Sequence, residues 1–78
     1  MGSKNNAGKY DCYAKAKDDE PMFILLARDP LAPMIVEEWA RWEENRLGHN
    51  TEKIQEAKNC ANEMRIWRKT NVPSPDPV

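Results

Sequence analysis

The stretch NTEKIQEAKNCANEMRIWRK, residues 50–69, decides the fold because it carries the clearest helical pattern in the chain. Asn50 and Thr51 are residue types that cap helix N-termini, and Glu52 follows in the first turn, where a negative charge suits the helix dipole. Residues recur along one side of the predicted helix at steps of three and four positions. This side comprises Ile54, Ala57, Ala61, Met64 and Arg68, with Cys60 and Trp67 beside them. The middle of this stripe is small, so we expect a second helix to approach closely there.

The second helix is predicted upstream, over residues 30–47. Its expected apolar face comprises Leu31, Ile35, Trp39 and Trp42, widened by Val36 and Ala40. Gly48 suits the position just past a helix C-terminus, where a positive φ is favourable. The short link that follows predicts that the two helices are antiparallel neighbours. We expect one of the two tryptophans to lie in the seam against residues 57–61, and the other to be partly available to a partner chain.

The stretch DDEPMFILLARDPLAP, residues 18–33, places five consecutive apolar residues between acidic residues and prolines. An acidic residue before Pro21 and before Pro30 is typical of a helix start, which predicts a short helix over 21–28. The stretch KYDCYAKAK predicts another short helix over 9–17. A buried strand is the alternative for the apolar run, but no second strand is expected to pair with it. The predicted fold is therefore all-α, with two short N-terminal helices followed by two longer antiparallel ones.

The chain has 78 residues, of which 40% are hydrophobic and 32% charged, and this composition fits one small globular domain. Residues 1–8 and 70–78 are rich in Gly, Pro, Asn and Ser, and they are expected to be flexible tails. Residues 9–69 then form the single helical domain. A core drawn from so few residues is thin, and chains of this size often need a partner chain.

Chemistry-bearing residues are few, and the sequence predicts a protein that is not an enzyme and needs no cofactor. The serines, Ser3 and Ser74, lie in the expected tails. One histidine, His49, and two distant cysteines, Cys12 and Cys60, do not make a standard zinc site. No apolar run approaches the roughly 18 residues of a membrane span. No apolar signal segment precedes the cysteines, so we expect reduced thiols and a cytoplasmic setting.

Charge and aromatic residues suggest binding instead. The net charge of −1 argues against binding to a nucleic-acid polymer, which rests on a basic surface. Tyr10 and Tyr13 stand one turn apart beside several lysines; they either stack on bases or pack the short helix onto the long ones. Arg28 lies at a predicted helix junction, where it either pairs with Asp18 or Asp29 or faces a ligand.

Residues 12–40, followed by a polar turn and a helix of the EAKNCANEMRIW type, resemble small proteins encoded in phage genomes. The family that they resemble is the phage anti-CBASS sponge family. The resemblance implies an oligomer, self-associated through helix faces, that traps a cyclic di- or trinucleotide in the bacterial host cell without cleaving it. It also implies that Tyr10 or Tyr13 stacks on a base, and that Arg28 and either Arg65 or Arg68 hold phosphates.

Two other functions are compatible with the sequence. The first is a small helical phage protein that binds and inhibits a host protein through an acidic or apolar helix face, with no small ligand. The second is a helix-turn-helix nucleic-acid binder that uses RIWRK, residues 65–69. The acidic residues of the helix over 30–47 and the net negative charge count against the second.

Overall fold

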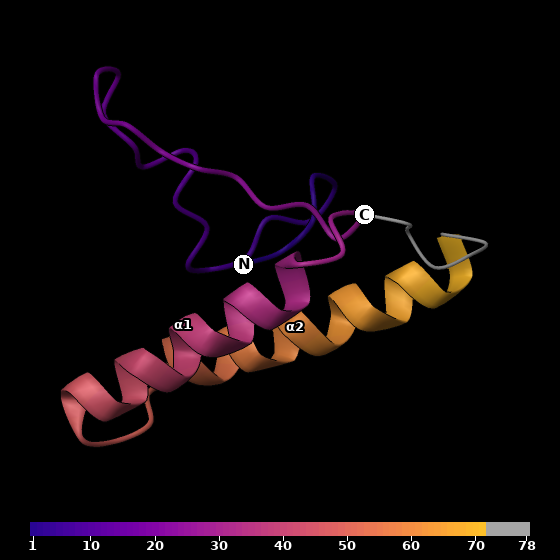
Figure 1. The fold of residues 1–78 in the computed structure, drawn as a ribbon. Helices are drawn as coiled ribbons and strands as arrows, with labels where there is room; N and C mark the ends of the chain where they lie inside the picture. Colours follow the sequence, from indigo (N-terminus) through magenta and orange to yellow (C-terminus); the bar gives the residue numbers. More distant parts are fainter. Residues whose placement is uncertain (72–78) are drawn as a thin grey trace.

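The computed structural model describes residues 1–71, and these residues form two helices and no strand. Helix α1 spans Ala32–Leu47 and helix α2 spans Glu52–Asn71. The helices pack side by side as a hairpin whose turn lies at one end of the molecule (Figure 1). The all-α prediction is confirmed, and so is the pair of long antiparallel helices.

The helix boundaries follow from their caps. Leu31 stands at the N-cap of α1 without a capping side chain; Asp29 Oδ1 accepts its N–H at 2.9 Å in the preceding turn, and a proline in the first turn suits a helix start. Thr51 caps α2, since its Oγ1 accepts the N–H of Ile54 at 3.2 Å. Gly48 ends α1 with φ 79°, and its N–H donates to Glu44 O at 2.8 Å. Both helices therefore begin two residues later than predicted, and α2 continues through Asn71 instead of ending at 69. The rest of the predicted C-terminal tail, 72–78, lies outside the described residues.

The two predicted short helices, 9–17 and 21–28, are absent, and residues 1–31 form turns and extended chain. Helix nucleation is costly, so a helix shorter than about 12 residues is marginal unless tertiary packing stabilises it. The 9–17 stretch keeps one helical hydrogen bond between main-chain atoms, from Ala16 N–H to Cys12 O at 2.9 Å. Pro21 and Pro30 bound the second stretch, so it had no room to lengthen. The four-helix layout is wrong.

The core lies between the two helices and is built from small residues. The buried apolar residues are Ala32, Ala40, Ile54, Ala57 and Ala61. Ile54 is the largest of them, and Val36 and Met1 pack against the cluster. The stripe predicted on α2 is thus confirmed at its first three positions, Ile54, Ala57 and Ala61. On α1 the face that was expected only to widen the stripe, Val36 and Ala40, is the one that contacts α2.

The tryptophans of α1 lie outside this core. Trp39 is 36% exposed and Trp42 is 67% exposed, so the expectation that one ring fills the seam is wrong. The cause is the close approach of the helices: where Ala40 meets an alanine stripe, an indole ring does not fit. Trp39 instead lies under the ammonium of Lys53, whose Nζ is 5.7 Å from the ring centroid. Trp42 is available to a partner, as the second half of that prediction required.

The N-terminal segment, residues 1–31, crosses one side of the hairpin and then makes a lobe that extends away from it (Figure 1). Ion pairs hold its beginning: the Met1 amine lies 3.2 Å from Glu56, and Lys9 Nζ lies 3.4 Å from Glu52. Many large apolar side chains of the described residues stay exposed, and Phe23 is the most exposed of them at 83%. This exposed apolar surface is the feature of the fold that bears most directly on function.

Candidate binding surfaces

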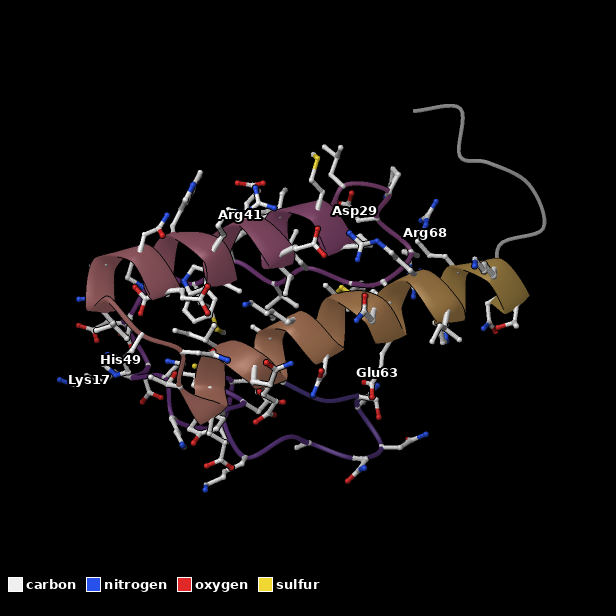
Figure 2. The ribbon with its side chains drawn as sticks, turned by 90° about the horizontal axis from the view of Figure 1, so that it is seen from below. Lys17, Asp29, Arg41, His49, Glu63 and Arg68 are labelled. Atoms are coloured by element: carbon white, nitrogen blue, oxygen red, sulfur yellow. The ribbon has the colours of Figure 1, made fainter. Side chains whose placement is uncertain are left out.

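Two of the arginines predicted to hold phosphates, Arg28 and Arg68, are brought together at one end of the hairpin. Arg68 Nη1 donates to the main-chain oxygens of Arg28 at 2.6 Å and Ala27 at 3.4 Å. Figure 2 shows Arg68 and Asp29 at this same end. The Arg68 guanidinium therefore fixes the turn that leads into α1. The Arg28 side chain is exposed, and no ion-pair partner for it is found among residues 1–71.

The third arginine, Arg65, is paired across the hairpin. Its Nη1 and Nη2 each lie 3.1 Å from a carboxylate oxygen of Glu37, and Nη1 also donates to Asn62 at 3.3 Å. The hydrogen bonds and positive charge of Arg65 lower the pKa of the Glu37 carboxyl. With both nitrogens engaged, Arg65 links α1 to α2, and a phosphate would have to compete with Glu37 for it.

The predicted tyrosines lie on the N-terminal segment. Tyr13 is 68% exposed, whereas Tyr10 is half-buried, with Lys9 Nζ 5.5 Å from its ring centroid. Lys9 also contacts Glu52 at the start of α2, and the hydrogen bond from Lys9 to that carboxylate raises the pKa of the lysine ammonium. Tyr10 is thereby tied near the turn end of the hairpin.

The tyrosines and the arginines are therefore not assembled into one site within a chain. Glu52, beside Lys9, and Arg68, beside Arg28, are separated along α2 by about 24 Å at 1.5 Å per residue. A ligand that contacts both groups would have to be held between two chains.

An open polar groove of about 390 Å³ runs between the two helices. Its lining residues are Glu37, Arg41, Glu44, Gln55, Lys58 and Asn62. The charges in it are mutually compensated: Lys58 Nζ lies 3.2 Å from Glu44, and Glu37 is held by Arg65. A groove with balanced, solvated charges offers neither a buried acid and base pair nor a cluster of cations for phosphate.

A row of exposed apolar side chains follows one flank of α1 and begins at Leu31, just before the helix. We call it the outer stripe; it comprises Leu31, Ile35, Trp39 and Trp42, which are 47%, 42%, 36% and 67% exposed. The spacing of four, four and three residues places them along one flank of the helix, centred about 120° around the helix axis from Val36 and Ala40. These residues were predicted as the apolar face of the helix, with one tryptophan in the seam and the other partly available to a partner chain. The matching small residues, Ala40 with Ala57 and Ala61, were the signal for the true seam.

Other reactive groups are dispersed over the described part of the chain. Both cysteines are free thiols: Cys12 is exposed, and burial raises the pKa of the half-buried Cys60 thiol. Within residues 1–71 no group of three or more His, Cys, Asp or Glu side chains is placed to hold a metal ion. Neither described helix has a long enough apolar run to cross a lipid bilayer.

Comparison of the chain with models of protein families, with curated proteins and with solved structures finds no match.

Proposed function

We propose that this chain is a non-catalytic binding protein that inserts the outer stripe of α1 into an apolar groove of a partner protein. One observation carries this proposal: beside the face of α1 that packs against α2, the outer stripe holds four large apolar side chains that are 36–67% exposed. Monomeric proteins rarely expose contiguous apolar patches larger than a few hundred Å² unless the patch serves binding.

The spacing of the outer stripe matches the way a helix is recognised in a groove. Such helices present anchors at i, i+3 or i+4, and i+7 to an apolar partner surface, and Ile35, Trp39 and Trp42 have this spacing. Tryptophan is enriched among the residues that contribute most to protein–protein affinity. Trp42, two-thirds exposed, has the most surface to lose on binding.

Charged pairs border the stripe. Arg41 Nη1 lies 2.5 Å from Glu38, and Arg46 Nε lies 2.7 Å from Glu43. These pairs supply the polar rim that commonly surrounds the apolar centre of an interface. In the setting implied by the resemblance, the partner is a host protein that a phage protein inhibits by occupancy.

The test is affinity capture from bacterial extract with the full chain, with Trp42→Glu and with Asn45→Glu as the matched control. Asn45 is exposed on α1 one turn further on and lies outside the outer stripe. We expect the wild type and Asn45→Glu to retain the same protein and Trp42→Glu to lose it. Recovery of the same proteins with all three chains would refute the proposal.

A second function, capture of a cyclic oligonucleotide between two or more chains, is supported by the exposed Arg28, whose main-chain oxygen is held by Arg68. An arginine can hold two phosphate oxygens at once and stays charged at any working pH. Because Tyr10 and Tyr13 lie far from Arg28 in one chain, the stacking face would come from a neighbouring chain.

Calorimetry with cyclic di- and trinucleotides tests this second function. Binding should be lost in Arg28→Ala and kept in Arg41→Ala, which removes an exposed arginine already paired on its own helix. Absence of heat with every cyclic nucleotide, in a chain that is well folded by circular dichroism, would exclude this function and leave partner-protein binding.

A further inference from the structure

Residues Met22–Leu26 form an extended apolar segment without a partner in the described chain. Phe23 is 83% exposed, and Met22, Ile24 and Leu26 are 57%, 57% and 53% exposed. Figure 1 shows this part of the chain returning from the N-terminal lobe toward the start of α1. Among residues 1–71, the peptide groups of residues 22–25 make no hydrogen bond to main chain or side chain. An extended segment with unpaired peptide groups and apolar side chains has the properties of an open strand edge.

We propose that residues 22–26 of two copies of this chain pair as an antiparallel two-stranded ribbon, with the two-fold axis at Ile24. Pairing would give each copy hydrogen-bond partners for its open peptide groups. A two-fold interface uses the same surface of both copies, which requires a segment that is complementary to its own reverse. This inference does not rest on the proposed function of the outer stripe.

The sequence of the segment meets that requirement in a single register. When Ile24 faces Ile24 of the second copy, the apolar run 22–26 overlies itself completely, with Met22 opposite Leu26 and Phe23 opposite Leu25. In the same register Glu20 of one copy and Arg28 of the other stand just beyond each end of the ribbon, so an acidic side chain comes near a basic one at both ends. Cross-strand pairs of opposite charge and of apolar side chains both stabilise an antiparallel pair.

The side chains needed at the ends are available. Arg28 is exposed, and only its main-chain oxygen is used, by Arg68. Glu20 is also exposed; its Oε1 accepts the N–H of Lys17 at 3.0 Å, which leaves Oε2 for the second copy. Pro21 lacks an N–H and stands at the start of the paired run, a position in which a strand tolerates proline. A bare two-stranded ribbon is marginal in water, so the exposed Phe23 and its neighbours must supply the apolar contacts.

Disulfide trapping tests the register. Cys12→Ser and Cys60→Ala remove the native thiols, and Ile24→Cys then places a thiol on the proposed axis. Directly opposed residues in an antiparallel pair have Cα atoms about 4.5–5.5 Å apart, a separation that a disulfide spans. Met34→Cys in the same background is the control, because Met34 is 53% exposed and lies outside the segment. We expect oxidation to give a covalent dimer from Ile24→Cys, and much less from the control. Equal cross-linking of the two variants would overturn the proposal.

A charge exchange tests the ends of the ribbon by sedimentation equilibrium. Glu20→Arg alone and Arg28→Glu alone should each weaken dimerisation, roughly tenfold or more, since each turns two cross-strand attractions into repulsions. The double variant, Glu20→Arg with Arg28→Glu, should restore the wild-type dissociation constant. Circular dichroism at 222 nm should be equal in all four chains, because the segment lies outside α1 and α2. A wild type that stays monomeric up to millimolar concentration would refute self-pairing, as would a double variant weaker than both single ones.

Discussion

Arg65 on α2 and Glu37 on α1 form a two-pronged contact, in which each of two guanidinium nitrogens lies 3.1 Å from a different carboxylate oxygen. The residues are 28 positions apart in the chain, so the pair fixes how the two helices lie along each other. Both side chains are about 40% exposed, which limits what the ion pair adds to stability in salt solution. Its clearest signature is therefore in the titration of Glu37.

The first prediction concerns that titration. Arg65 holds the pKa of Glu37 below its ordinary value of 4.5, chiefly by hydrogen bonding to the carboxylate. A carboxyl whose pKa is lower in the folded than in the unfolded state stabilises the fold above the unfolded pKa. That contribution is lost as the pH falls through the folded pKa. In Arg65→Gln, an NMR titration should show a higher pKa for Glu37, and stability should depend less on pH in this acidic range.

Arg41→Gln is the control for this titration, because Arg41 affects Glu37 only weakly and through charge alone. It should raise the pKa of Glu37 less than Arg65→Gln does. Equal shifts in both variants would mean that general charge, and not the two-pronged contact, sets the titration of Glu37.

The second prediction concerns Gly48, where α1 ends. Its φ of 79° lies in the left-handed region, and a Cβ at this position would meet no atom within 4 Å. Replacement by Ala should thus cost only the strain of holding a residue with a Cβ in the left-handed conformation, about 1 kcal/mol of unfolding free energy. Gly48→Asn should cost less, since Asn tolerates this conformation better. Urea unfolding of both variants measures the difference, and equal stability of Gly48→Ala and the wild type would contradict the assigned backbone.

The third prediction compares Ile54 with Trp42. Ile54 is the one large side chain buried completely among the described residues, and its replacement by Ala should cost about 2–5 kcal/mol. Trp42 is two-thirds exposed, so Trp42→Ala should change the unfolding free energy by no more than about 0.5 kcal/mol. Both are measured by thermal or urea unfolding at one protein concentration, because self-association would add to the apparent stability. A large loss at Trp42 would place that ring in an interface already formed in solution.

The sequence was sufficient to predict the helical hairpin because local signals agree there. Gly48, the capping residue Thr51 and the small stripe Ala57–Ala61 all specify the same arrangement. The face of α1 was misassigned because its larger apolar residues, Ile35 and Trp39, outweigh Val36 and Ala40 in any count of hydrophobicity. Packing follows steric fit, and small residues on α2 select small residues on α1.

The N-terminal segment could not be predicted because long-range contacts fix it. Proline and acidic residues indicate where a helix can begin, but not whether enough packing exists to stabilise a short one. Residues 1–31 are instead held by two ion pairs, Met1 with Glu56 and Lys9 with Glu52. A hydrogen bond from Arg68 to the main-chain oxygen of Arg28 holds the end of the segment. Each contact joins residues about 40 or more positions apart, and no local pattern reports such pairs. For the same reason the separation of the tyrosines from the arginines was not visible in the sequence.

The last prediction concerns Arg68 as the anchor of the turn before α1. In that turn the N–H of Asp29 donates to Leu26 O and the N–H of Leu31 donates to Asp29 Oδ1, each at 2.9 Å. The Arg68 guanidinium holds the same turn through the oxygens of Ala27 and Arg28. Arg68→Gln removes the guanidinium that donates to these two oxygens, so the turn should open more often. Amide hydrogen exchange at positions 29 and 31 should then accelerate. Lys69→Gln, an exposed neighbour, is the control and should leave both amides unchanged. Unaltered exchange in Arg68→Gln would mean that the turn is held by its own hydrogen bonds, and that Arg68 remains available for a ligand.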